Sequence, residues 1–337
     1  MQVRNEESRP KRRELGVSSP MILTDSTGLP AGGIGKFAKE ISISTAVRGA
    51  VSVPLPASSP IRSTSRGLFS RLRTVPFILL HLAALAVICF VPITWTSAGL
   101  MVGFYFLRMF GITGGYHRYF AHRSYRTSRL FQFALAWIGC SAVQKGPLWW
   151  ALNHRHHHRY SDEEDDPHSP VVRTIWWSHV GWVLSGQYRK TNLEEIKDYS
   201  VFRELRILNK LHWLPGLVLG TLCYLIDGMS GLGWGFVVGT VALYHATFLV
   251  NSACHIWGRR RYETSDRSKN NWWAALITMG EGWHNNHHHY MSSARQGFMW
   301  WEVDVSYYII RSLAFVGIVW DVREPTEKAL ATKRIAS

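Results

Sequence analysis

The stretch PFILLHLAALAVICFVPIT, residues 76–94, carries no charged side chain over 19 residues. A run of about 20 predominantly apolar residues is long enough, as a helix, to cross the hydrocarbon core of a bilayer. A second run, SAGLMVGFYFLRMFGIT at residues 97–113, follows almost at once and has a single arginine near its end. Two apolar helices separated by so few residues predict a helical hairpin.

The same pattern recurs later in the sequence, as LHWLPGLVLGTLCYLI (residues 211–226) and GLGWGFVVGTVALYHATFLV (residues 231–250). The predicted fold is therefore an all-α integral membrane protein with four transmembrane helices in two hairpins. The expected spans are about 76–94, 97–115, 211–227 and 231–250, and a helical cap outside the membrane is expected to carry the histidine-rich segments. A soluble hairpin of buried helices is the alternative, but four such runs seldom share one soluble domain.

Basic residues at the ends of these runs predict their orientation. Arginine clusters flank the apolar runs at Arg66, Arg71 and Arg73, at Arg123, Arg126 and Arg129, and at Arg259, Arg260 and Arg261. Because cytoplasmic loops carry an excess of Lys and Arg, these ends are expected in the cytoplasm, together with the cap. The net charge of +15 fits a membrane surface or an acidic partner. We expect a multi-pass membrane protein and no nucleic-acid partner.

The terminal segments differ in composition from the apolar region. Residues 1–70 are basic and rich in Ser, Pro and Gly, which predicts a disordered tail. They contain no apolar core of a secretory signal, and their acidic residues argue weakly against a transit peptide. A membrane domain is expected over residues 71–325 and a C-terminal tail over 326–337. Cys89, Cys140, Cys223 and Cys254 lie in apolar stretches without a CxxC pair, which predicts buried thiols in a reducing compartment.

Two histidine clusters lie about 130 residues apart: NHRHHHRY at 153–160 and EGWHNNHHHY at 281–290. Successive residues of an α-helix are offset by about 100°, so positions i, i+3 and i+4 share one face. That face holds His154, His157 and His158 in the first cluster and His284, His287 and His288 in the second. His156 and His289 are expected to point away from it.

Two shorter motifs, HRYFAH (117–122) and NSACH (251–255), follow the second and fourth apolar runs. Asn251 and His255 are four residues apart and share a helix face. His117 and His122 are five apart, about 140° around a helix, so they serve one site only if the helix ends or bends there. The glycines at 111, 114 and 115 make a bend plausible. The topology places all four motifs on one side of the membrane, where they can form one site.

The motifs together supply nine candidate imidazole ligands. One metal ion accepts about four to six ligands, so two ions are the simpler interpretation. Imidazole suits Fe, Zn, Cu and Ni. Zinc hydrolases use fewer histidines and usually a carboxylate. A histidine-rich pair of ions beside a membrane fits redox iron better, since iron can activate O2.

The motifs HRYFAH, NHRHH, NSACH and EGWHNNHH resemble the histidine boxes of membrane fatty-acid desaturases. The stearoyl-CoA (Δ9) desaturase family, with its bacterial acyl desaturases, is the most similar group. The similarity covers roughly residues 75–325 and includes DPHSP (166–170), WWSHVGW (176–182) and SARQGFMWWEVD (293–304). It implies a di-iron site that uses O2 and two electrons to insert a cis double bond, at Δ9, into a saturated acyl chain.

The resemblance also implies roles for individual residues. The implied metal ligands are His117, His122, His154, His157, His158, His255, His284, His287 and His288, with Asn251 acting through a bound water. Gln144, Trp150 and Thr247 match positions that shape a kinked acyl tunnel, although Trp150 could also be an interfacial aromatic residue. Asp166 is expected to orient a ligand imidazole, with His168 beside it. Taken alone, the run DEEDDPH (162–168) could be a solvated loop or a calcium site.

Substrate carrier and electron donor are less constrained. Family members that bind CoA carry polar or charged groups near the second box, where this protein has Lys145, Leu152 and Asn153. Acyl-CoA, acyl-carrier protein and acyl-lipid therefore all remain open as substrates. The haem-binding signature HPGG does not occur, so a separate donor of the ferredoxin or cytochrome b5 type, with its reductase, is expected. Arg155 and Arg159, which interleave with the ligands, suggest a basic docking rim for an acidic carrier.

Two other functions use similar features. A membrane hydroxylase or alkane monooxygenase also has histidine boxes, and its product is an alcohol where a desaturase makes an alkene. A histidine-rich metal transporter is the alternative from a different class, but transporters usually place ligands within the spans. The spans here hold only single histidines. His81, His179, His212 and His245 are expected to be packing or interface residues.

Overall fold

The computed structural model describes residues 74–335. The predicted N-terminal tail and the arginines at 66, 71 and 73 lie outside the described residues. Two of the described helical runs, Trp95–Ala121 and Leu214–His255, are long and apolar enough to cross a membrane, and Val75–Phe90 is a shorter apolar helix.

The first hairpin consists of α2 (Val75–Phe90) and α3 (Trp95–Phe110). Helix α2 ends two residues before Pro92, whose missing N–H cannot continue a helix. Helix α3 begins with a reciprocal cap, in which the side chains of Thr94 and Ser97 each accept the other residue's backbone N–H at 2.9 Å. Helix α3 continues into the π-helix η1 (Gly111–Ala121), so this helix is longer than the predicted span of 97–115.

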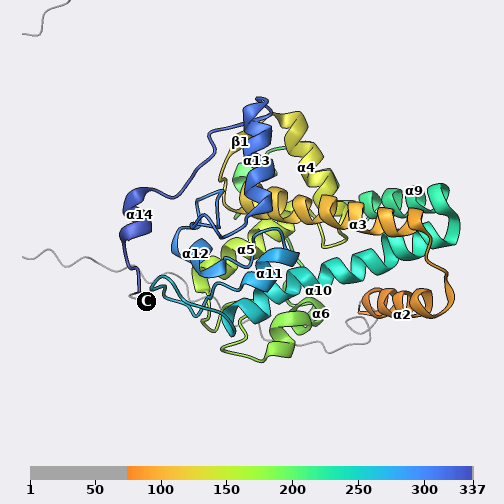
Figure 1. The fold of residues 1–337 in the computed structure, drawn as a ribbon, viewed down its shortest axis with the longest axis horizontal. Helices are drawn as coiled ribbons and strands as arrows, with labels where there is room; N and C mark the ends of the chain where they lie inside the picture. The colour runs from red at the N-terminus through yellow and green to blue at the C-terminus, as the bar shows by residue number, and fades with distance from the viewer. Residues whose placement is uncertain (1–73, 336–337) are drawn as a thin grey trace, which may run out of the picture. The chain divides into compact units, whose positions relative to one another are not determined.

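The second hairpin consists of α9 (Leu214–Ser230), the π-helix η3 (Gly231–Val238), α10 (Gly239–Ser252) and the short 3₁₀ turn η4 (Ala253–His255). The helical run is interrupted at Asp227 and Gly228, where Gly228 adopts a φ of 55°. Glycine tolerates this left-handed conformation because it has no Cβ. The backbone reverses there, so the predicted third and fourth runs form two adjacent helices (Figure 1).

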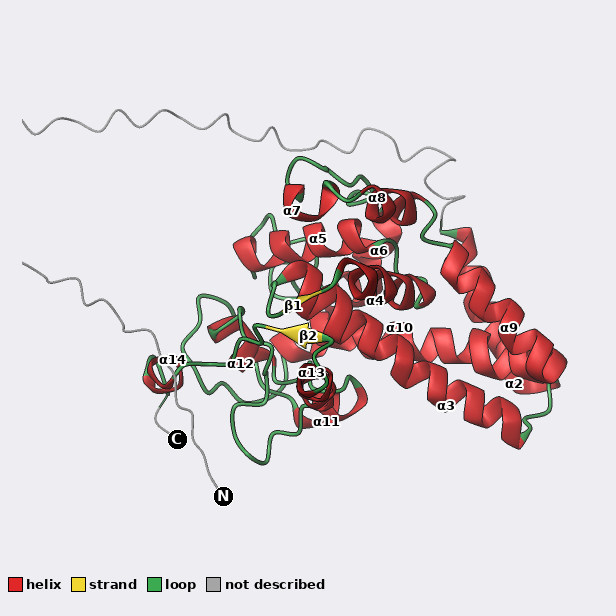
Figure 2. Cartoon of the chain, turned by 90° about the horizontal axis from the view of Figure 1, so that it is seen from above, coloured by secondary structure: helices red, strands yellow, loops and turns green. Residues whose placement is uncertain are grey.

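The remaining elements are short and almost all helical. In sequence order they are β1 (Arg126–Thr127), α4 (Arg129–Ser141), α5 (Pro147–Tyr160), η2 (Trp177–Gly181), α6 (Trp182–Ser185), α7 (Lys197–Ser200), α8 (Arg203–Lys210), α11 (Trp272–Ile277), α12 (His284–His289), α13 (Val305–Phe315), β2 (Val319–Trp320) and α14 (Glu327–Ala331). Strands β1 and β2 pair antiparallel, with Arg126 opposite Trp320. Figure 2 shows α5 and α12 near one end of the helices α3 and α10, and α9 and α2 toward the other.

Close packing fixes α4 against the π-helix η1. A Cβ on Gly139 would come within 2.2 Å of the Tyr116 ring, and one on Gly111 within 2.8 Å of Ile138. Only glycine permits these approaches. The Tyr116 ring, wholly buried, joins Phe120 and Leu135 in the main hydrophobic core. Tyr119, Phe120 and Ala121 of the histidine motif at 117–122 belong to the same core.

The outer faces of the long helices are apolar and exposed. Phe90, Trp95 and Leu225 are 84%, 96% and 74% exposed, and the exposed residues around them are also mostly apolar. An apolar surface of this extent marks an interaction with a membrane or another protein. The prediction that all four thiols are buried is wrong for Cys89, which is exposed on α2. An evenly apolar helix gives no periodicity to distinguish its outward face from its packed face.

Three of the single histidines form a row of contacts that ties three elements together. His81 on α2 contacts His245 on α10, with 3.2 Å between their Nε2 atoms. The other nitrogen of His245 lies 3.0 Å from Nε2 of His179 on η2. His81 also donates to the carbonyl of Phe77. These contacts agree with the prediction of packing histidines.

Candidate metal centre

The π-helix η1 explains how His117 and His122 serve one site. The backbone N–H of His122 donates to the carbonyl of His117 at 3.1 Å, the i→i+5 bond of a π-helix. Residues five apart are thereby about one turn apart, and the two rings lie 4.8 Å from each other, centroid to centroid. The expectation that both reach one site is met by a widened helical turn. The helix does not end at the glycines, because Gly111–Ala121 continues α3 helically.

Five imidazoles converge in one group, the five-histidine group: His117, His122, His154, His158 and His287. Their Nε2 atoms face one another, at 3.0 Å between His117 and His287 and 2.9 Å between His122 and His154. His158 lies 3.0 Å from His154 and 2.9 Å from His287. Elements η1, α5 and α12 thus direct their nitrogen atoms to one point.

The other four predicted ligands form the four-histidine group: His157, His255, His284 and His288. The Nε2 atoms of His255 and His284 are 3.1 Å apart. The Nε2 atoms of His157 and His288 are buried and have no hydrogen-bond partner among the described residues. In each group the candidate ligand atoms lie within 4.8 Å of one another.

Both groups fit a metal ion. A buried nitrogen without a partner is costly, and a bound cation would satisfy it. Metal binding needs neutral imidazole, and burial holds the pKa of His154 and His158 well below 6.5. Burial and the neighbouring histidines do the same for the pKa of His284 and His287. These rings are therefore neutral at pH 7, with lone pairs available to a metal.

Carboxylates contact the Nδ1 atoms of four of the nine rings. Both oxygens of Asp166 lie 3.0 Å from Nδ1 of His157. Asp162 and Asp266 accept from His255 and His288 at 2.9 and 2.6 Å, and Glu281 contacts His117. Each contact fixes the ring orientation and leaves Nε2 for a metal. Burial alone would lower the pKa of His157, but the Asp166 carboxylate outweighs it and raises that pKa.

Sequence reasoning anticipated Asp166 and missed the other three carboxylates. Asp162 follows the second box by four residues, and Glu281 precedes the His284 position by three, so their proximity to a box was a usable signal. Asp266 lies in a loop distant from both clusters and offered no such signal. The backbone N–H of His168 donates to Asp166 at 3.0 Å, and its ring lies 4.3 Å from that of His157. His168 therefore lies beside the ligands, as expected.

His156 and His289, which were predicted to point away from the ligand faces of their helices, lie outside both groups. His156 is half-buried on α5 and bonds the carbonyl of Asp165 at 3.1 Å. His289 stacks on Tyr262, with 4.0 Å between ring centroids, and donates to the carbonyl of Ala329. That last bond anchors α14, which lies within the predicted C-terminal tail.

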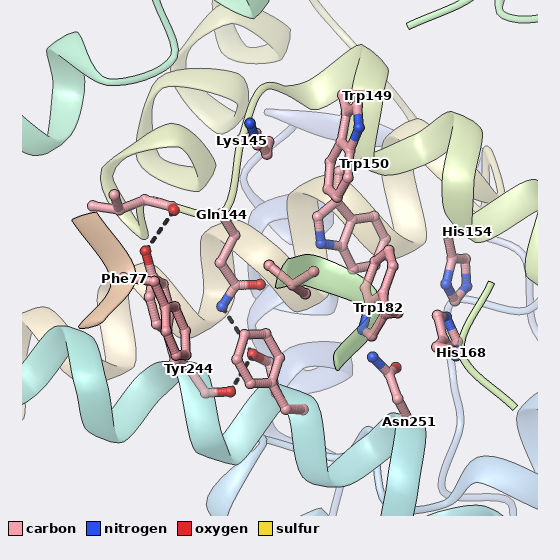
Figure 3. Close-up of a pocket in the computed structure, with 14 residues that line it drawn as sticks. Phe77, Gln144, Lys145, Trp149, Trp150, His154, His168, Trp182, Tyr244 and Asn251 are labelled. Carbon is pink, nitrogen blue, oxygen red and sulfur yellow. Dashed lines mark hydrogen bonds between the residues drawn. The ribbon is translucent and has the colours of Figure 1, made fainter. Parts of the chain in front are cut away.

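A pocket with about 720 Å³ of empty volume reaches the metal ligands (Figure 3). Gln144 donates to the hydroxyl of Thr247 at 2.8 Å across it. Trp150 stacks on His154, with 5.0 Å between centroids. The pocket is lined by Phe77, Val143, Gln144, Lys145, Trp149, Trp150, His154, His168, Trp182, Val183, Tyr244, Thr247, Phe248 and Asn251. The three residues expected at a tunnel kink therefore share one pocket.

A second pocket, of about 450 Å³, shares Trp150, His154, Thr247 and Asn251 with the first. Its other walls include Met109 and Ile112 of the first hairpin. Its lining also includes His117, His157 and His284, so both histidine groups contribute to it. Trp150, His154, Thr247 and Asn251 therefore line both pockets, which places the two pockets next to each other.

The loop between α4 and α5 is held in an unusual backbone conformation. Val143 and Lys145 have φ values of 60° and 72°, which is costly, above all for β-branched valine. Tyr244 donates to the carbonyl of Val143 at 2.7 Å, and Tyr116 donates to that of Lys145 at 3.0 Å. These bonds compensate the strain and hold Gln144 in the pocket wall. Asn153 is buried, and its amide donates to the carbonyl of Trp149.

Most of the arginines at the helix ends and beside the histidine motifs are engaged in the fold. Arg155 donates to the carbonyls of Phe120 and Ala121 at 2.7 and 2.9 Å, at the end of the π-helix, and pairs with Asp198. The other ion pairs are Arg123 with Asp198, Arg126 with Asp321, Arg129 with Glu204 and Arg261 with Glu302. The expectation that Arg155 serves docking is therefore corrected, since its guanidinium caps a helix end. Arg159 and Arg259 are exposed and make no ion pair among the described residues.

We expect Arg155→Met to destabilise the protein by roughly 1–3 kcal/mol, because it leaves two helix-terminal carbonyls without a donor and removes one of the two guanidinium partners of Asp198. Thermal unfolding in detergent measures the change. Arg159→Met, an exposed position on the same helix, is the matched control and should change stability by less than about 0.5 kcal/mol. Equal effects of the two substitutions would contradict the capping role.

Comparisons with known proteins agree with this geometry. The sequence profile described as fatty acid desaturase matches residues 92–314. The Delta-9 acyl-lipid desaturase 2 of Arabidopsis thaliana is 40% identical over 240 residues, 69% of this chain and 77% of that protein. The acyl-CoA C20 Delta5-desaturase of Anemone leveillei is 37% identical over 261 residues, 74% of this chain and 82% of that protein. The resemblance seen in the histidine boxes is confirmed, and the chain belongs to the fatty acid desaturase family.

Proposed function

We propose that this protein is an O2-dependent desaturase that inserts a cis double bond at Δ9 of a saturated fatty acyl chain. The observation that carries the proposal is the convergence of nine imidazoles in two groups, four of which, His117, His154, His157 and His284, line the adjoining pockets. Family membership supports oxidoreductase chemistry on an acyl substrate. The relatives include both Delta-9 and Delta5 desaturases, and the more identical of the two described above is a Delta-9 enzyme.

The proposed cofactor is a pair of iron ions, one at each histidine group. When bound, iron supplies the activation of O2 that is required to break an unactivated C–H bond in the middle of an acyl group. In the balanced reaction, the acyl group gives up two hydrogens, and these join O2, two electrons from a donor and two protons to form two waters. Asn251 lines both pockets beside the four-histidine group, where we propose that it holds a water that completes the coordination there.

The protein's own residues would position the substrate. Gln144, Trp150 and Thr247 would hold the acyl group so that one methylene pair faces the ligands, with the hydrocarbon running from the first pocket into the second. Apolar walls around the hydrocarbon exclude water from the reacting carbon atoms. Asp166 would keep the proton of His157 on Nδ1, with His168 packed beside them.

The proposed topology is four transmembrane helices in two hairpins, α2 with α3 and α9 with α10. The apolar exposed faces of these helices and the arginines at their ends support it. We propose that the histidine groups lie on the cytoplasmic side, within a membrane domain of residues 71–325. The substrate would be a fatty acyl-CoA or an acyl-lipid, because the relatives include both kinds of enzyme.

Expression in a host that cannot make unsaturated fatty acids tests the function. The expected result is growth without added unsaturated fatty acid, with cis double bonds at Δ9 when the lipids are mapped by mass spectrometry. Alcohols in place of alkenes would indicate a hydroxylase. Accumulation of metal in cells, without any O2-dependent product, would indicate a transporter. Either of these outcomes would overturn the desaturase proposal.

Electrons would come from a separate acidic carrier of the ferredoxin or cytochrome b5 type, with its reductase. Arg159, on the α5 helix that carries three ligands, and Arg259, four residues after His255, are exposed and free to attract it. We expect carrier-dependent turnover to slow by roughly tenfold when NaCl rises from about 0.05 M to about 0.5 M, because salt screens such attraction. Stopped-flow reduction by the carrier measures this rate.

The matched control is reduction by a small uncharged chemical donor, which should not respond to salt. Arg159→Glu combined with Arg259→Glu should remove most of the salt dependence. Arg260 is left unchanged, because it bonds the loop that holds Asp266. Carrier-dependent turnover that ignores both salt and these substitutions would rule out the basic docking surface.

A further inference from the structure

We infer that the two metal positions are unequal: the four-histidine group binds its ion more tightly and favours its more oxidised state. The inference rests on the proposed two-metal function and deepens it. The observation behind it is that the carboxylates next to the two groups differ in number and in their own partners.

In the four-histidine group, three of the four rings contact a carboxylate through Nδ1. Asp166 accepts from His157, Asp162 from His255 and Asp266 from His288, at 2.6–3.0 Å. All three carboxylates are largely buried, with side-chain exposures of 0%, 6% and 5% respectively. Only Nδ1 of His284 has no partner among the described residues. Up to three negative charges therefore face one metal position.

None of these three carboxylates is paired with a guanidinium or ammonium group in the described structure. Their remaining bonds come from neutral donors: Asp162 accepts from Ser169 Oγ and the backbone N–H of Arg267, and Asp266 from Thr264 and Ser268. Such donors orient a carboxylate without cancelling its charge. The negative charge next to this group is therefore left for the metal to balance.

The five-histidine group has the opposite surroundings. Among its rings only His117 contacts a carboxylate, Glu281, within the described residues. That carboxylate is shared with the fully buried guanidinium of Arg118, at 2.9 Å, and Arg118 also pairs with Asp304 at 2.8 Å. A second guanidinium, that of Arg155, bonds the carbonyl of Ala121, the residue before His122. The carboxylates near this group, Glu281, Asp304 and Asp198, are each paired with a guanidinium group of Arg118, Arg155 or Arg123, so cations offset their negative charge.

Charge differences of this kind matter because the site is buried. Electrostatic interactions strengthen as the local dielectric falls, so fixed charges around a buried ion are only weakly screened. A carboxylate behind a ligating imidazole raises its basicity, and loss of such a partner typically lowers metal affinity about 10–100-fold. Net charge around a metal also sets its reduction potential. The ion backed by three carboxylates should therefore bind first and give up an electron first.

Titration of the metal-free full-length protein with Co2+ alone tests the affinities. Two binding steps are expected, monitored by Co2+ absorption and by competition with a chelator. Asp162→Asn and Asp266→Asn should each weaken the tighter step about 10–100-fold and leave the weaker step unchanged. Glu281→Gln is the matched control, the same change of carboxylate to amide behind the other group, and should weaken only the weaker step. The unaffected step in each variant shows that the fold is intact.

Mössbauer spectra of the 57Fe-loaded protein after partial oxidation test the second half of the inference. One of two ferrous signals should convert to ferric first, and Asp266→Asn should abolish or reverse that order. Two steps of equal affinity, or variants that weaken both steps alike, would overturn the inference. These outcomes are separate from the test of function, because Co2+ binding needs no catalysis. Two unequal steps without alkene formation in the host would overturn only the proposed function.

Discussion

Replacing His287 by alanine should abolish activity and lower metal content. His287 contacts His117 and His158 through Nε2, at 3.0 and 2.9 Å, so its ring lies centrally among the five nitrogens. Loss of an outer partner typically weakens a metal site about 10–100-fold, and loss of a direct ligand should cost more than about 100-fold in affinity. Elemental analysis of the purified protein should show close to two iron ions per molecule before the change and fewer after it.

His157→Ala should have the same effect on the other group, because His157 is buried and its Nε2 has no other partner among the described residues. The matched controls are His156→Ala and His289→Ala, neighbours of these ligands on the same two helices. Their rings bond backbone carbonyls outside both groups, so they should keep substantial activity and full metal content. Active protein with one zinc ion and no iron would refute the two-iron proposal. A control that loses metal while folded would refute the helix-face argument.

Replacing Thr247 by tryptophan should block the acyl pocket or move the double bond. Thr247 lines both pockets and holds Gln144 through a 2.8 Å bond. An indole at this point would fill the passage next to Trp150, and overpacking of a well-packed site costs about 1–3 kcal/mol. Gas chromatography of the products should show one of two changes. Either the long-chain alkenes are lost, or the position of the double bond or the chain length of the product is altered.

Ala242→Trp is the matched control for this substitution. It adds the same side chain to the same helix, α10, at an exposed position outside both pockets. The product profile of this variant should be that of the unchanged protein. If Thr247→Trp also leaves the profile unchanged, Thr247 does not shape the path of the acyl group.

Much of the metal centre could be predicted from local patterns. The spacing of His154, His157 and His158 is repeated at His284, His287 and His288, and helix geometry puts each set on one face. All nine predicted ligands lie in the two groups. The long apolar runs likewise predicted four helical segments, because burial or membrane contact of a whole helix is visible in composition alone.

The division of the nine histidines between the two groups was not predictable in this way. His157 joins one group while its neighbours His154 and His158 join the other, and His287 is separated from His284 and His288 in the same manner. A helix face is wide enough to contribute histidines to both groups. The choice depends on where α5 and α12 lie relative to η1 and η4, which no local spacing records.

Local patterns were therefore sufficient for the family, the apolar helices and the identity of the candidate ligands. Three features depended on packing in space. They are the π-helical turn that brings His117 and His122 together, the hydrogen bond between Asp266 and His288, and the hydrogen bonds from Arg155 to the end of η1. The difference comes from the range of the interactions. Periodicity and composition express contacts within one helix, whereas these partners lie 22 or more residues apart or depend on how the backbone packs against a core.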